Sequence, residues 1–198
     1  MIISEILHNE TQSSAPMLGD HLAMDLLNTE ARDDGRAVEF WNSDADVLQW
    51  LARYNIVPAS KGDSFAPAEL LTQAKALRTL AHKLISEFKE EKTSDISELN
   101  QYLHAFDTRP HLARDAEGKL TLSRISHTDS IGALLGPVAE AVAQLLVEGN
   151  FALVKQCEHP DCILWFYDRT KAHKRRWCSM ALCGNRHKAA QFRKRSSS

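Results

Sequence analysis

The chain has 198 residues, of which 43% are hydrophobic, and a net charge of −2, values typical of a globular protein that forms a core without disulfides. Its first residues carry no basic stretch ahead of an apolar one, which excludes a recognisable secretory signal peptide. The longest apolar run, residues 131–154, is interrupted by Pro137, Glu140, Gln144 and Glu148. We therefore interpret this run as a core helix and expect a cytoplasmic protein that does not enter a membrane.

Spacing of apolar residues predicts that the first 150 residues are mostly helical. We expect a polar leader over residues 1–16 and one domain over residues 17–150. Its helices are predicted at residues 18–29, after a cap at residues 43–46, and at 67–90, 94–105 and 128–147. Alternating apolar residues around a glycine-containing turn predict a β-hairpin with strands at 112–114 and 120–123.

Charge is divided unevenly along the chain. Residues 1–150 contain 13 basic and 23 acidic residues, a net charge of −10, whereas residues 151–198 contain 11 basic and 3 acidic residues, a net charge of +8. Such a split predicts that the C-terminal segment meets a polyanion. A solvated basic tail is the simpler interpretation, but a tail has no use for the aromatic residues here: Trp165, Phe166, Tyr167, Trp177 and Phe192.

All four cysteines fall within a window of 27 residues, as the pairs Cys157/Cys162 and Cys178/Cys183. Two close pairs separated by a short stretch predict one zinc ion held by four thiolates. Such a site has no open position for a substrate, so the ion is structural. The alternatives are an iron–sulfur cluster, four unrelated thiols, or two disulfides, which the cytoplasm disfavours. A histidine could also replace one thiolate: His159, His173 or His187.

Two stretches of the sequence are similar to known families. One is Cys157-x4-Cys162-x3-Phe166-x-Asp168-x-Thr170, followed by Arg175-Arg176-Trp177-Cys178-Ser179-Met180-x2-Cys183-Gly184-Asn185-Arg186-x-Lys188. It resembles the CGNR zinc finger. The other, Gly19-x2-Leu22-x-Met24-Asp25-x2-Asn28-Thr29, resembles the opening of the ABATE domain, which usually precedes that finger. The resemblance implies a bacterial, stress-linked transcription regulator whose finger binds DNA.

The expected fold is mainly α with small β elements (α+β), with a helical N-terminal domain and a C-terminal zinc finger. The finger is expected over residues 151–195 and a disordered tail over residues 196–198. We predict a treble-clef-like module, in which zinc replaces a core that so short a segment cannot build. A terminal helix over about residues 184–194 is expected to turn Ala189 and Phe192 toward the metal.

Basic and amide side chains of this module are predicted to contact nucleic acid, in particular double-stranded DNA. They are Lys174, Arg175, Arg176, Asn185, Arg186, Lys188, Gln191, Arg193, Lys194 and Arg195. Two alternatives remain open. One is RNA binding, with bases stacked on Trp165, Tyr167 or Trp177. The other is a zinc-stabilised adaptor that meets an acidic protein partner.

The acidic N-terminal domain is expected to sense a small-molecule effector, to form a homodimer, or both. His21, Asp25, Asn28 and Thr29 cluster on one predicted helix and its end, where they are candidates for a ligand pocket. Helix capping and internal hydrogen bonding are the alternative roles for these four side chains. The sequence contains no glycine-rich phosphate loop, nucleophile elbow or metalloprotease pattern, so an enzyme is not predicted.

Overall fold

The computed structural model describes residues 14–33, 35–58, 65–126 and 130–196. Most of the predicted leader, the start of the helix predicted at 128–147 and the last two residues of the predicted tail lie outside these ranges. The helices are α2 (Leu22–Leu27), α3 (Asp44–Ala52), α4 (Glu69–Lys89), α5 (Ser97–Ala105), α6 (Ile131–Glu148) and α7 (Asn185–Ser196), with a π-helical turn, η1 (Met180–Gly184). The strands form three antiparallel pairs: β1 (Glu30–Asp33) with β2 (Arg36–Glu39), β3 (Thr108–Arg114) with β4 (Leu120–Ser126), and β5 (Val154–Gln156) with β6 (Trp165–Tyr167). The α+β prediction is confirmed.

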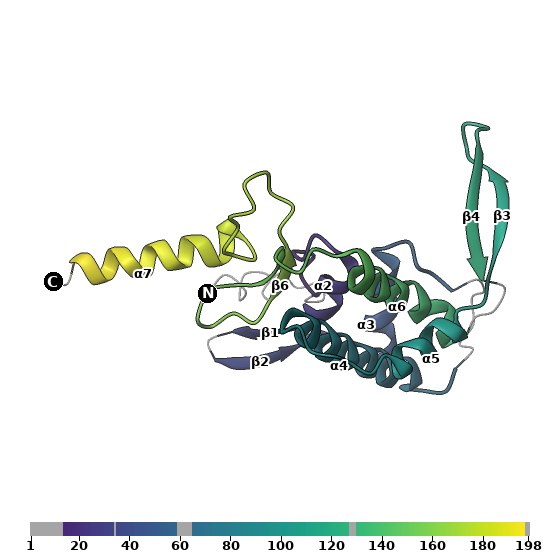
Figure 1. Cartoon of the computed structure of the whole chain (residues 1–198), viewed down its shortest axis with the longest axis horizontal. Coiled ribbons are helices and arrows are strands. Elements are labelled where there is room, and N and C mark those ends of the chain that lie inside the picture. The colour runs from purple at the N-terminus through teal and green to yellow at the C-terminus, as the bar shows by residue number, and fades with distance from the viewer. Residues whose placement is uncertain (1–13, 34, 59–64, 127–129, 197–198) are drawn as a thin grey trace.

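The core of the N-terminal domain lies between α2, α4 and α6, which pack against one another (Figure 1). Helix α4 buries an apolar stripe that includes Leu70, Leu77 and Leu84, as its periodicity predicts. The apolar spacing that predicts a helix at 18–29 implies one buried and one exposed face, yet residues 23–27 of α2 are all buried. The reason is that α2 also contacts β6 from the finger, so its outer face is covered.

Helix α6 is long and apolar enough to cross a membrane by length and composition, and among the described residues it alone meets that test. Its side chains include Val138, Ala139 and Val142, which are fully buried. It packs against α5, α2 and α4 with Pro137 inside the helix. This packing agrees with its interpretation as a core helix.

Two β-hairpins extend the helical body. The hairpin predicted at 112–123 is present but longer, and in Figure 1 it stands clear of the helices. The β1–β2 hairpin was not predicted, because its strands are only four residues long and contain few β-branched or aromatic residues. Its Glu39 reaches Arg78 on α4, a charged residue within the buried stripe of that helix.

The Arg78 guanidinium is buried and lies 2.9 and 2.7 Å from the two Glu39 carboxylate oxygens. It also donates to Thr29 Oγ1 at 3.0 Å. Burial by itself would raise the pKa of Glu39, but the hydrogen bonds from Arg78 and from the Trp41 N–H lower it below its usual range. The charged pair therefore fastens the β1–β2 hairpin to α4.

Replacing Glu39 by Gln should lower the free energy of unfolding at pH 7 by about 1–3 kcal/mol, because the buried Arg78 keeps only the more distant Glu30 carboxylate, 3.6 Å away, as a counter-charge. A lowered pKa stabilises the fold above the unfolded-state value of about 4.3 and loses this effect as pH falls through the folded-state value. Urea unfolding of both proteins from pH 7 to pH 3.5 measures the difference, which should shrink below about pH 4. Other titrating groups cancel because both proteins share them. A pH-independent difference would contradict this account.

Candidate metal centre and nucleic-acid interface

The structure brings the four cysteines together. Their Sγ atoms all lie within 4.8 Å of one another, at 3.8 Å between Cys162 and Cys178 and 3.5 Å between Cys178 and Cys183. In a tetrahedral site with zinc–sulfur bonds of about 2.3 Å, the sulfur atoms stand about 3.8 Å apart. The four cysteines are free of disulfides. The cluster fits one zinc ion with four thiolate ligands and no open position.

Two tight turns present the cysteines. The first lies between β5 and β6, where the Cys157 N–H donates to Leu164 O and the Cys162 N–H to His159 O, both at 2.9 Å. The second begins at Ser179, which caps η1 and accepts the Cys183 N–H at 3.0 Å. His159 is buried, but its Nδ1 accepts the Asp161 N–H at 3.2 Å within the first turn. It therefore supports the turn, and among the described residues the metal-binding group consists of cysteines alone.

The thiols are close enough to share protons. Hydrogen bonds from the neighbouring thiols, that of Cys162 first, lower the pKa of Cys157. The same bonds, that of Cys157 first, raise the pKa of Cys178. A zinc ion deprotonates all four thiols and replaces the shared protons.

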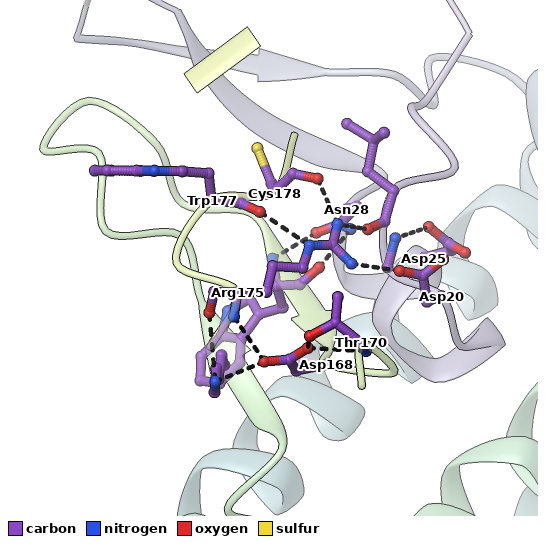
Figure 2. A network of polar contacts seen from close by, with 12 residues as sticks. Asp20, Asp25, Asn28, Asp168, Thr170, Arg175, Trp177 and Cys178 are labelled. Atoms are coloured by element: carbon purple, nitrogen blue, oxygen red, sulfur yellow. Dashed lines mark hydrogen bonds and ion pairs between the residues drawn. The ribbon is translucent and has the colours of Figure 1, made fainter. Parts of the chain in front are cut away.

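Arg175 connects the finger to the N-terminal domain (Figure 2). Its guanidinium donates to three backbone carbonyls, those of Leu18, Trp177 and Cys178, and pairs with the Asp20 carboxylate. It also lies 4.2 Å from the centre of the Phe166 ring. Arg175 was predicted to contact nucleic acid, but its donors are turned toward these protein groups.

The ABATE-like signature, residues 19–29, supplies further contacts between the N-terminal domain and the finger. Asn28 Nδ2 donates to Trp165 O at 2.9 Å, and its Oδ1 accepts the Trp165 N–H at 2.8 Å. The Gly19 carbonyl accepts the Tyr167 N–H at 2.7 Å. A Cβ on Gly19 would stand 2.5 Å from Met24 Cβ, so only glycine allows this close approach. The signature therefore forms a docking surface for β6.

The candidate pocket residues take mainly capping and internal roles. His21 Nδ1 accepts the Ala23 N–H and caps α2. The buried Asp25 carboxylate accepts the Gly19 N–H at 2.8 Å, although burial keeps its pKa raised. Thr29 donates to Leu26 O at 2.7 Å. Asn28, as described above, binds the finger backbone.

Asp168 also stabilises the finger, although the sequence analysis named it only within the CGNR-like motif and not as a site residue. Its side chain is fully buried and accepts from Lys155 Nζ at 2.7 Å, Thr170 Oγ1 at 2.6 Å and the Arg175 N–H at 2.9 Å. Burial would raise the pKa of Asp168, but these bonds, Lys155 first, hold it well below its usual range. The carboxylate therefore fixes the loop that leads from β6 to Arg175.

Helix α7 carries most of the other predicted nucleic-acid contacts and extends away from the body (Figure 1). Arg186, in the first turn of α7, is partly buried. The side chain of Lys194 lies outside the described part of the chain. Exposed side chains on the helix are Asn185, Lys188, Gln191, Arg193 and Arg195, and on the preceding loop Lys174 and Arg176.

The expectation that Ala189 and Phe192 face the metal is wrong. Ala189 is exposed, and Phe192 is 72% exposed. The helix extends away from the body (Figure 1), and its beginning contacts the finger, where the centres of the His187 and Trp177 rings lie 4.7 Å apart.

These features define a class of protein: a helical domain with a docked C-terminal finger built on a structural zinc ion. The family model ABATE, described as "Putative stress-induced transcription regulator", matches residues 20–149. The model of the CGNR zinc finger matches residues 154–196. The chain therefore belongs to the ABATE family and carries a CGNR zinc finger, which confirms the resemblance noted in the sequence. No curated protein gave a significant match.

Native mass spectrometry should detect one zinc ion per chain, and Cys178→Ser should lose it, because three thiolates leave the tetrahedron incomplete. His187→Ala is the matched control, since it removes a possible ligand from the same region and should retain the ion. Zinc retained by Cys178→Ser, or lost by His187→Ala, would contradict the four-cysteine assignment.

Replacing Arg175 by Ala should lower the free energy of unfolding by about 2–4 kcal/mol, because it leaves three carbonyls and Asp20 without their donor. The neighbouring Arg176→Ala is the control. Its ion pair with Glu158 is exposed on both sides, so its loss should cost less than about 1 kcal/mol. Urea unfolding measures both, and equal effects would show that Arg175 does not join the two parts.

Proposed function

We propose that this protein is a transcription regulator that binds double-stranded DNA through α7. The observation that carries the proposal is the position of this basic helix, which leaves the zinc cluster and extends away from the other labelled helices and strands (Figure 1). A helix of 12 residues is about 18 Å long, and a major groove about 12 Å wide admits it.

One stripe of α7 is suited to reading DNA. Asn185, Lys188, Phe192 and Arg195 are spaced by three, four and three residues, so they share a face, and all four are exposed. The two cations would contact phosphates, which position the helix. Asn185 suits an adenine edge, and the Phe192 ring suits a thymine methyl group.

The alternative of RNA binding, with bases stacked on the aromatic residues, has less support. Trp165 is buried with its ring against His82, and the Tyr167 hydroxyl accepts the Asn150 N–H. Trp177 is partly buried and stacked on His187. The aromatic side chains on which RNA bases would stack therefore already contact other groups of the protein.

The proposal also covers the location of the protein, its biological role and the task of its N-terminal domain. We propose a cytoplasmic regulator linked to stress, without enzymatic activity, whose acidic N-terminal domain senses an effector or forms a homodimer. The net charge of −10 on residues 1–150 would keep that domain off the phosphate backbone and orient the finger toward it.

The double variant Lys188→Ala/Arg195→Ala should weaken binding to duplex DNA, because two phosphate contacts are lost. The slope of log affinity against log salt should flatten by about 0.9 for each contact. Fluorescence anisotropy with zinc-loaded protein at several salt concentrations measures both quantities, using a duplex recovered by selection from random DNA.

The control is Lys83→Ala/Lys119→Ala, which removes the same charge from exposed sites on α4 and the β3–β4 turn. It should bind DNA almost as the unaltered protein does. Equal weakening in both variants would mean that only net charge matters, and no enrichment of any duplex would contradict a sequence-specific regulator.

A further inference from the structure

A hollow of about 580 Å³ lies where the finger meets the N-terminal domain. Its volume falls within the range of small-molecule sites. The finger supplies most of its wall from residues 170–180, and the domain supplies Leu18 and Asp20. The hollow is therefore a junction between the two parts, separate from the cluster of His21, Asp25, Asn28 and Thr29.

The wall combines apolar and hydroxyl groups. Leu18, Trp177 and Met180 supply apolar surface, while Thr170 and Ser179 supply hydroxyls. Met180 is 52% exposed. An exposed methionine beside an indole offers an adaptable apolar contact for a flat ring.

The charges around the hollow favour an anion. Asp20 lines it, but Arg175 neutralises that carboxylate. Of the other described residues in the wall, Lys174 and Arg176 are exposed cations, whereas the thiolate of Cys178 is buried in the zinc cluster. Arg176 pairs with Glu158, yet the two side chains are 59% and 49% exposed, so this pair exchanges readily with another anion.

We propose that this hollow binds a small aromatic carboxylate. Its ring lies against Leu18, Met180 and the edge of Trp177, whose indole already contacts His187 and Arg176. Its carboxylate meets Lys174 and Arg176. Such a ligand touches both Leu18 and Trp177, whose carbonyls Arg175 joins, so binding tightens the docking of the finger. An effect on DNA affinity would follow by linkage and rests on the proposed function; ligand binding itself does not.

The test uses 2-naphthoate as the probe and the indole N–H signals of the zinc-loaded full chain as the readout, with no nucleic acid present. The Trp177 signal, assigned with Trp177→Phe, should shift and saturate, while those of the buried Trp41, Trp50 and Trp165 should not. Lys174→Ala/Arg176→Ala should raise the Kd at least about tenfold, because two charge contacts of about 0.7 kcal/mol each are lost. The control Lys83→Ala/Lys119→Ala, which removes the same charge outside the hollow, should leave the Kd unchanged.

A cation of similar shape, 2-naphthylmethylamine, should produce no saturable shift at Trp177. The proposal is overturned if 2-naphthoate leaves the Trp177 signal in place, if the amine binds equally well, or if both double variants change the Kd alike. Zinc content of each variant is measured beforehand, so that loss of the metal is not mistaken for loss of the site. Because DNA is absent, these outcomes are distinct from failure of the DNA-binding proposal.

Discussion

The guanidinium of Arg175 is the interaction on which the arrangement of the two parts depends. It joins the Leu18 carbonyl of the N-terminal domain to the Cys178 carbonyl, which belongs to a zinc ligand. Only arginine offers five N–H donors in one plane, so a lysine cannot reproduce this set of bonds. The direction in which α7 leaves the molecule therefore follows from a contact made ten residues earlier in the chain.

Two neighbouring arginines show that residue type alone does not determine the structural role of a side chain. Arg175 is partly buried and bound to backbone carbonyls, whereas Arg176 is exposed, pairs with an exposed carboxylate and lies over the Trp177 ring. The Asp168 carboxylate accounts for the difference, because it accepts the Arg175 N–H and fixes the loop. A buried acid thus determines which cation supports the fold and which remains at the surface.

The parts of the fold that sequence analysis predicted depend on local patterns. Helix α4 follows from its apolar period, and the zinc cluster follows from the spacing of four cysteines, since a turn is a local event. The features that sequence analysis could not predict depend on contacts between residues far apart in the chain. Glu39 makes a short charged hairpin stable through Arg78, and Asn28 serves β6 rather than its own helix. Phe192 looked like a core residue from its spacing, but its side chain is 72% exposed on a helix that extends away from the body (Figure 1).

One short segment contributes both to the zinc site and to the docking of the finger on the N-terminal domain. The metal therefore influences more than the structure of the finger. Residues 175–178 contain both the arginine that reaches Leu18 and a thiolate of the cluster. The finger segment is too short to hold this geometry without the ion. Loss of zinc therefore loosens the Arg175 bonds as well as the turn that starts α7. Among the described elements, α7 packs chiefly against η1, so its orientation depends on both. Metal binding and the contacts of Leu18 and Asp20 with Arg175 consequently act on the basic helix through residues 175–178.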